Sequence, residues 1–148
     1  MAELPGSVLF ACYHNAIRSA MAENIMRFLH GRKVFVQSAG IRPGELDPFA
    51  VAALDEIGID LSRHRPRSFE DLEDAYFDLV ISLAPEAQHR AVELTRSTAT
   101  EIEFWNTPDP SLVTEGTREV RLEAYRAVRD GLLRRIRQRF PAEGAAGV

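Results

Sequence analysis

The sequence predicts an α/β fold built around a mostly parallel sheet. Short apolar runs, typical of buried strands, alternate along the chain with longer segments in which apolar residues recur at helical spacing. Turn-prone residues separate these segments, and no separator has the length or composition of a linker. We therefore expect a single domain over residues 1–148, with a core from about 7 to 140 and a flexible tail over 141–148.

Predicted strands and helices follow one another along the chain. The strands are Ser7–Ala11, Lys33–Gln37, Phe77–Leu83 and Glu101–Trp105. The helices are Arg18–Leu29, Pro48–Ile57, Pro85–Arg96 and Glu119–Phe140. The turn-prone run Ser38-Ala39-Gly40 is expected to end the second strand, and Pro85 occupies a first-turn position that proline tolerates. Phe104 and Trp105 are expected to pack in the core.

Composition excludes several classes of protein. The single cysteine rules out an intramolecular disulfide and a cysteine-based zinc site. No apolar run approaches the roughly 20 residues of a membrane span, and no secretion signal is evident, so we expect a cytoplasmic protein without a membrane partner. The net charge of -4 argues against bulk electrostatic binding of nucleic acid. A recognised phosphate is therefore expected to be a single group held in a pocket.

Arginines accumulate toward the end of the last predicted helix. They are Arg126, Arg129, Arg134, Arg135, Arg137 and Arg139. Because acidic residues are interleaved with them and cations near a helix C-terminus complement its dipole, we interpret them as a solvated face rather than a polyanion site.

One stretch carries the residue types of nucleophilic catalysis. Cys12 ends the first predicted strand, and Arg18 and Ser19 begin the first predicted helix. In an open α/β sheet, ligands bind beyond the carboxyl ends of the strands, where loop and helix N–H groups converge. The loop between them can surround a tetrahedral oxyanion, and the guanidinium of Arg18 can bind two of its oxygens. This loop consists of Tyr13, His14, Asn15, Ala16 and Ile17.

The same positive field favours the nucleophilic thiolate of Cys12, and the hydroxyl of Ser19 can donate a hydrogen bond to it. Asn15 tolerates the left-handed backbone conformation that such a loop requires. Asp109, between Pro108 and Pro110, is the best candidate for the acid that protonates a leaving group. The alternative is that Cys12 is a small buried residue and that its spacing to Arg18 is coincidental.

Taken together, these motifs resemble the low-molecular-weight protein tyrosine phosphatase superfamily, which includes thiol-dependent arsenate reductases. The resemblance covers about Ser7 to Phe140 and rests on Val8-Leu9-Phe10-Ala11-Cys12…Asn15…Arg18-Ser19…Met21-Ala22-Glu23, Ser38-Ala39-Gly40, Gly58-Ile59-Asp60-Leu61-Ser62…His64-Arg65, Asp78-Leu79-Val80 and Asp109-Pro110. It implies a three-layer fold, with helices on both faces of a four-stranded parallel sheet, and chemistry that needs no metal and no cofactor.

The resemblance also implies roles for individual residues. Cys12 would be the nucleophile, Arg18 the oxyanion clamp and Asp109 the general acid and base. A supporting hydrogen-bond network would include Asn15, Ser19, Ser38 and His64. For His64, a solvated turn over Arg63-His64-Arg65 is the alternative.

Three functions are compatible with these residues. The first is a metal-independent phosphomonoester hydrolase with a cysteinyl-phosphate intermediate, acting on a phosphorylated protein or a small phosphomonoester. Phosphotyrosine specificity is not supported, because Ser111 and Leu112 follow Asp109-Pro110 where aromatic residues are usual, although Tyr13 could supply one wall of a substrate site. The second is an arsenate reductase that uses an external thiol or a glutaredoxin-like partner, since the chain has no second cysteine. The third is a non-catalytic oxyanion-binding protein.

Overall fold

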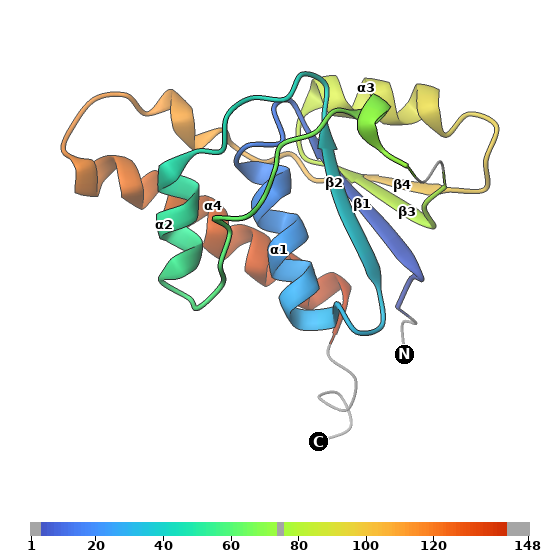
Figure 1. Ribbon diagram of the computed structural model, residues 1–148, viewed down its shortest axis with the longest axis horizontal. Helices are drawn as coiled ribbons and strands as arrows, with labels where there is room; N and C mark the ends of the chain where they lie inside the picture. Colours follow the sequence, from blue (N-terminus) through green and yellow to red (C-terminus); the bar gives the residue numbers. More distant parts are fainter. Residues whose placement is uncertain (1–3, 74–75, 142–148) are drawn as a thin grey trace.

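The computed structural model describes residues 4–73 and 76–141 as a parallel sheet covered by helices (Figure 1). The strands are β1 (Ser7–Cys12), β2 (Phe35–Gly40), β3 (Leu79–Ser82) and β4 (Glu101–Phe104). They pair in the order β2-β1-β3-β4, and every pairing is parallel. The helices are α1 (Arg18–His30), α2 (Pro48–Asp55), α3 (Pro85–Leu94) and α4 (Arg118–Arg139), with 3-10 turns η1 (Phe69–Asp71) and η2 (Pro110–Leu112). The four-stranded parallel α/β fold is thus confirmed, whereas 142–148 of the predicted tail lie outside the described residues.

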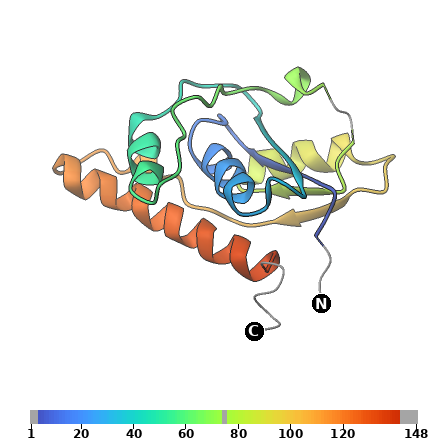
Figure 2. The same cartoon turned by 60° about the horizontal axis from the view of Figure 1, so that its bottom comes forward.

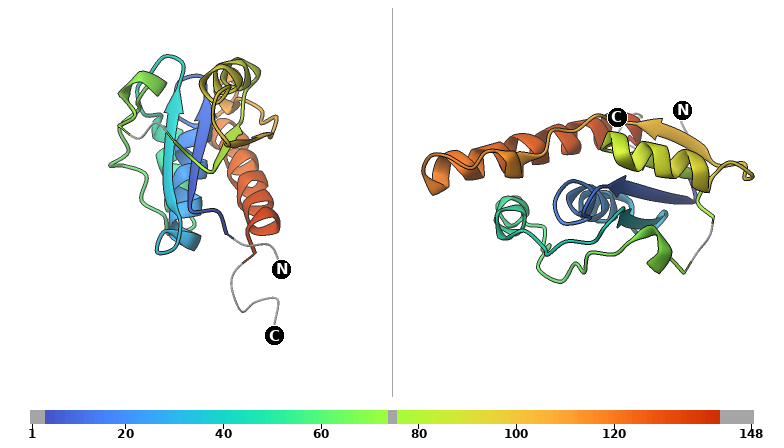
Figure 3. Two further views of the ribbon diagram at one scale, coloured as in Figure 1. Left: turned by 90° about the vertical axis from the view of Figure 1, so that its right-hand side faces the viewer. Right: turned by 90° about the horizontal axis from the view of Figure 1, so that it is seen from above.

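The central strand β1 is buried on both faces of the sheet. Val8, Phe10 and Cys12 belong to the larger hydrophobic cluster, which β1 shares with α1, α2 and α4, whereas Leu9 and Ala11 belong to a second cluster with residues of α3. This division follows from the alternation of side chains along a strand. Figures 2 and 3 show the long α4 passing beside α1 and α2, with which it is in contact.

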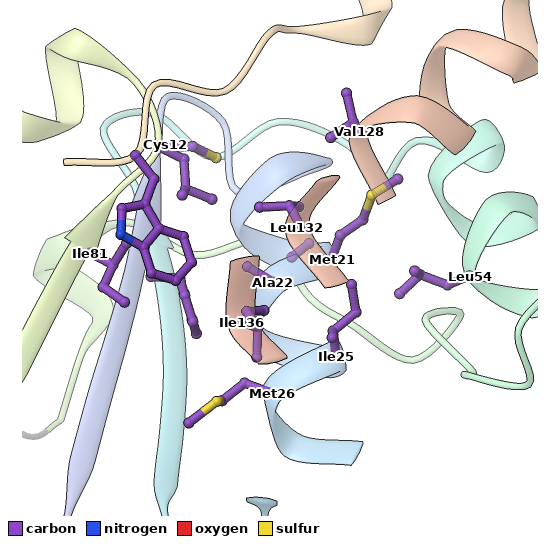
Figure 4. Packing of buried hydrophobic residues seen from close by; sticks show 14 of the residues in the cluster. Cys12, Met21, Ala22, Ile25, Met26, Leu54, Ile81, Val128, Leu132 and Ile136 are labelled. Atoms are coloured by element: carbon purple, nitrogen blue, oxygen red, sulfur yellow. The ribbon is translucent and has the colours of Figure 1, made fainter. Parts of the chain in front are cut away.

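Cys12 lies at the margin of the larger cluster, where β1 ends. Figure 4 shows its sulfur above the packed side chains of α1 and α4, among them Met21, Ala22, Leu132 and Ile136. The chain leaves β1 toward β2 on one side and returns to β3 on the other, so Cys12 lies at the topological switch point where ligands of open α/β sheets bind.

Two of the sequence predictions were wrong in detail. Ser38-Ala39-Gly40 is not a turn: these residues continue β2 and pair with Phe10, Ala11 and Cys12. Residues that favour turns in isolation are held extended here by the parallel neighbour, which places Ser38 inside the protein. Phe104 is not in the core either, since its side chain is 41% exposed on the edge strand β4, whereas Trp105 is 3% exposed and faces the core, as predicted.

No helix among residues 4–73 and 76–141 is both long and apolar enough to cross a membrane.

Gly40, at the end of β2, leaves no room for a side chain. A Cβ atom there would lie 2.6 Å from the carbonyl oxygen of Tyr13 and 2.8 Å from the backbone nitrogen of Asn15. We expect Gly40→Ala to lower the free energy of unfolding by about 1–3 kcal/mol, because the loop backbone would have to shift. Urea denaturation followed by circular dichroism measures this change.

Gly131 within α4 serves as the control. A Cβ atom at Gly131 would meet nothing nearer than an Arg134 nitrogen at 4.0 Å, so Gly131→Ala should raise the free energy of unfolding by about 0.5–1 kcal/mol. Equal effects of the two substitutions would contradict the close approach at Gly40.

Candidate active site

The loop between β1 and α1, residues 12–19, is called the anion loop below. Asn15 has the one positive φ of a non-glycine residue in the described chain, 55°, which is the left-handed conformation that asparagine tolerates. This turn folds the loop back, so that the backbone N–H of Asn15 points at Cys12 Sγ, 3.3 Å away. The backbone of the loop therefore curls around the position of the sulfur.

The thiol of Cys12 has two polar neighbours. Besides the N–H of Asn15, the Oγ atom of Ser19 lies 2.8 Å from Sγ. Ser19 Oγ accepts a hydrogen bond from Nδ2 of Asn15 at 2.8 Å, which leaves the hydroxyl proton of Ser19 available for the sulfur. Two donors directed at one sulfur stabilise a thiolate as a nucleophile and as a leaving group.

The side-chain amide of Asn15 uses all of its hydrogen-bonding capacity. Nδ2 donates to Ser19 and to Ser38, each at 2.8 Å. Oδ1 accepts from the backbone N–H of Arg67 at 3.0 Å and from Nε2 of His64 at 3.1 Å. One buried side chain thus ties the anion loop to α1, to β2 and to residues 64–67.

A buried carboxylate, Glu23, lies beneath this network. Its side chain is 2% exposed, accepts a hydrogen bond from Ser38 Oγ and forms an ion pair with Arg27. Arg27 in turn donates to the carbonyl oxygen of Val36 at 2.9 Å. No role was predicted for Glu23 from the sequence. Glu23 follows Ser19 by four residues and so lies on the same face of α1, and this spacing could have indicated that it supports the site.

His64 lies inside the protein rather than on a solvated turn, with 2% of its side chain exposed. Nε2 is 3.1 Å from both the backbone oxygen and Oδ1 of Asn15, so it donates, while Nδ1 is 3.9 Å from a Glu23 carboxylate oxygen. Burial lowers the pKa of His64, and the cations Arg67 and Arg27 lower it further, whereas Glu23 opposes the shift. His64 is therefore neutral at pH 7.

A cavity of about 260 Å³ opens above the anion loop and is called the Cys12 pocket below. Its lining consists of Cys12, His14, Ala16, Ile17, Arg18, Gly44, Glu45, Asp47, Asp109 and Ser111. The pocket thus brings together the thiol, the cation and the carboxylate that the sequence analysis singled out, although they are up to 97 positions apart, from Cys12 to Asp109.

Arg18 and Asp109 are held by the segment that follows β4. Nη1 of Arg18 donates to the carbonyl oxygen of Thr107 at 3.2 Å, which orients the guanidinium toward the loop that carries Asp109. Oδ1 of Asp109 accepts from the N–H of Ser111 at 2.9 Å and from its hydroxyl at 2.6 Å. Among the described residues, Oδ2 of Asp109 has no hydrogen-bond partner, so it is the oxygen able to exchange a proton with a ligand.

Two further acids of the pocket, Glu45 and Asp47, were missed in the sequence analysis. Asp47 begins α2 by accepting from the N–H of Phe49 at 2.8 Å, and its second oxygen accepts from the hydroxyl of Tyr125 at 2.7 Å. Burial and the charge of Asp47 raise the pKa of Tyr125 above its ordinary value. The sequence Asp47-Pro48 predicts that Asp47 caps the N-terminus of a helix. No local pattern in the sequence predicts that Asp47 also lines the Cys12 pocket.

Tyr13, which the sequence offered as one possible wall of a substrate site, does not line the Cys12 pocket in the described part of the chain; its ring packs edge-on against His14, with centroids 4.6 Å apart. His14 lines the pocket instead, because its Nδ1 donates to the carbonyl oxygen of Arg42 at 3.0 Å. Residues 4–73 and 76–141 contain no cluster of three or more His, Cys, Asp or Glu side chains suited to a metal ion.

The buried, neutral state of His64 makes stability depend on pH. Because the pKa of His64 is lower in the folded chain than its ordinary value of 6.5, the unfolded state takes up a proton first as the pH falls. The stabilisation is complete above pH 6.5 and is lost as the pH falls from there toward the folded-state pKa. We expect the free energy of unfolding to fall more steeply in the wild type than in His64→Gln over about pH 7 to 5.

His89→Gln is the matched control, because His89 is exposed and, in the described chain, its one ion pair is with Glu93 on α3. In denaturant titrations at each pH, the free energy of unfolding of His89→Gln should depend on pH as it does in the wild type. Parallel curves for the wild type and His64→Gln would contradict a neutral, buried His64.

Known proteins share this fold. The model of the low molecular weight phosphotyrosine protein phosphatase family matches residues 7–142. The glutaredoxin arsenate reductase of Synechocystis sp. is 32% identical over 131 residues, 87% of this chain and 92% of that protein. A structure described as an arsenate reductase in the phosphate binding state has a TM-score of 0.74 and 30% identity, covering 89% of this chain and 94% of that one. A mutant of the YwlE arginine phosphatase, with a TM-score of 0.69, 24% identity and coverage of 89% and 91%, shares the fold. The chain is therefore a cysteine-based enzyme of the low molecular weight phosphotyrosine protein phosphatase family.

Proposed function

We propose that this enzyme reduces arsenate and passes the resulting arsenic adduct to an external thiol. The observation that carries the proposal is the Cys12 pocket, in which Cys12, Arg18 and Asp109 line one cavity large enough to hold an oxyanion. Curated relatives that are 30–34% identical bear the name arsenate reductase, which favours arsenate over a phosphate ester as the substrate. The sequence alone placed the phosphomonoester hydrolase first and the arsenate reductase second, and the relatives reverse this order.

In the first step, the Cys12 thiolate attacks the arsenic of arsenate. A sulfur–arsenic bond forms, and one arsenate oxygen departs as water after taking a proton from Asp109. The N–H groups of the anion loop and the guanidinium of Arg18 hold the remaining oxygens, as expected for donors fixed before the reaction. Arsenic stays in its +5 state, so this step needs no reductant.

In the second step, an external thiolate attacks Cys12 Sγ and breaks the sulfur–arsenic bond. The bonding electron pair leaves with arsenic, which departs as arsenite in the +3 state, and a mixed disulfide remains on Cys12. A second thiol then attacks this disulfide and releases Cys12 as a thiolate. Both reducing equivalents must come from outside the chain, because Cys12 is its only cysteine.

Hydrolysis of a phosphomonoester is the second candidate function, and the position of Asp109 favours it. Cysteinyl-phosphate chemistry needs an acid for the leaving group and then a base for water. Oδ2 of Asp109 can perform both tasks in turn. A binding protein without turnover is the weakest candidate, because binding alone requires neither the thiol nor the acid.

The two reactions are separated by assaying one preparation with both substrates. We expect arsenite to form from arsenate and glutathione, with or without a glutaredoxin, and no arsenite to form with Cys12→Ser. Asp109→Asn should lower the rate by about 10²- to 10⁴-fold, the usual contribution of a general acid. Hydrolysis of 4-nitrophenyl phosphate without any arsenite would overturn the reductase in favour of the phosphatase.

Asp60→Asn provides a matched control. Asp60 makes the same turn as Asp109, since its Oδ1 accepts from the N–H and hydroxyl of Ser62 at 2.9 and 2.6 Å. It is exposed and does not line the Cys12 pocket, so its variant should keep full activity. Equal losses in the two variants would mean that the loss in Asp109→Asn is not specific to its position in the Cys12 pocket.

A further inference from the structure

A second cavity, of about 780 Å³, lies between residues 106–113 and α4 and is called the α4 groove below. Small residues of α4, namely Ala124, Ala127 and Gly131, line one side. A glycine inside a helix costs about 0.5–1 kcal/mol relative to alanine. A Cβ atom at Gly131 would meet no atom nearer than 4.0 Å, so no packing contact in the described chain requires glycine at this position. A larger side chain at Gly131 would project into the groove.

The far end of the α4 groove is basic. Three arginines of α4 are neutralised by carboxylates: Arg126 and Arg129 pair with Glu56, and Arg139 pairs with Glu103. Arg134 and Arg135 line the groove, and neither has a carboxylate partner among the described residues. The guanidinium of Arg135 lies 5.0 Å from the centre of the Trp105 ring, which fixes its position. The groove therefore complements a ligand with acidic groups at one end.

The α4 groove and the Cys12 pocket share a wall. Asp109 lines both cavities, and Thr107, which lines the groove, accepts the hydrogen bond from Arg18. Asp109 immediately precedes η2, which contacts α4, and it lines the groove together with Ala124, the residue before Tyr125.

From Tyr125, the helix rises about 13 Å to Arg134, and arginine side chains lean back toward the N-terminus, which shortens the gap. An extended tripeptide spans about 10 Å, a length of the same order as this rise.

We propose that the α4 groove binds an anionic peptide thiol of the glutathione type, which supplies the electrons for Cys12. Its carboxylates would pair with Arg134 and Arg135, and its thiolate would reach Cys12 Sγ past Asp109, breaking the sulfur–arsenic bond as described above. Glu45 and Asp47 also line the Cys12 pocket, and their charges disfavour the approach of an anion past the N-terminus of α2. This inference rests on the proposed function, in which the second thiol comes from outside the chain.

A comparison of thiols tests the groove. In the variant Arg134→Gln/Arg135→Gln, the KM for glutathione should rise about tenfold or more, while the KM for uncharged 2-mercaptoethanol should stay the same. Arg137→Gln is the control, because Arg137 lies on the same helix but does not line the α4 groove in the described chain. An unchanged KM for glutathione in the double variant would overturn the proposal.

Binding is measured without turnover by titrating S-methylglutathione, which cannot reduce Cys12. Trp105, the single tryptophan, adjoins Arg135 and reports binding through its fluorescence. The signal should saturate in the wild type and in Arg137→Gln, and it should be lost in the double variant. Gly131→Leu should abolish it by filling the groove while leaving the far-ultraviolet circular dichroism spectrum unchanged.

Failure of the inference differs from failure of the proposed function. If no thiol yields arsenite, the proposed reductase function is wrong, and so is the proposal that the α4 groove binds a thiol. If glutathione and 2-mercaptoethanol both yield arsenite with no response to the arginine substitutions, only the thiol site is wrong. Arsenite formation that requires a glutaredoxin, together with no binding of S-methylglutathione, also overturns the small-thiol site and leaves the reductase intact.

Discussion

The left-handed turn at Asn15 is the constraint on which the rest of the site depends. It reverses the chain directly after β1, so that a backbone N–H points at Cys12 Sγ instead of continuing a sheet. A strained backbone persists only where surrounding contacts fix it, and here the amide of Asn15 is held by Ser19, Ser38, Arg67 and His64. Because these partners come from α1, β2 and the segment at 64–67, the fold as a whole holds the anion loop in shape before any ligand arrives.

Charge around the site is arranged in layers. Positive charge lies at the base of the Cys12 pocket, where backbone N–H groups and Arg18 meet in a chain whose net charge is -4. Beneath the loop, Glu23 is compensated by Arg27 and Ser38, so the buried carboxylate orders the network at little electrostatic cost to an oxyanion above. Glu45 and Asp47 also line the pocket and disfavour the approach of a second anion on their side.

Features that depend on the pattern of neighbouring residues could be predicted from the sequence. Features that depend on strand pairing or on contacts between distant segments could not. Hydrophobic periodicity predicted the strands and helices, and the spacing of Cys12 to Arg18 predicted the loop, because both are properties of neighbouring residues. The extension of β2 through Ser38 could not be predicted in this way, since the neighbouring β1 imposes it. The places of Asp47 in the Cys12 pocket and of Arg134 in the α4 groove depend on contacts between segments far apart in the chain. The supporting role of His64, by contrast, came from the resemblance alone.

The central claim is that the anion loop holds a tetrahedral oxyanion directly over the Cys12 thiol. It is tested most directly by the rate at which iodoacetamide alkylates Cys12, the only cysteine, in the presence of arsenate or phosphate. Our account predicts that either oxyanion slows alkylation in a saturable manner, that chloride at equal ionic strength does not, and that Arg18→Gln abolishes the protection while Cys12 remains reactive. Alkylation at the same rate with and without oxyanion would contradict it.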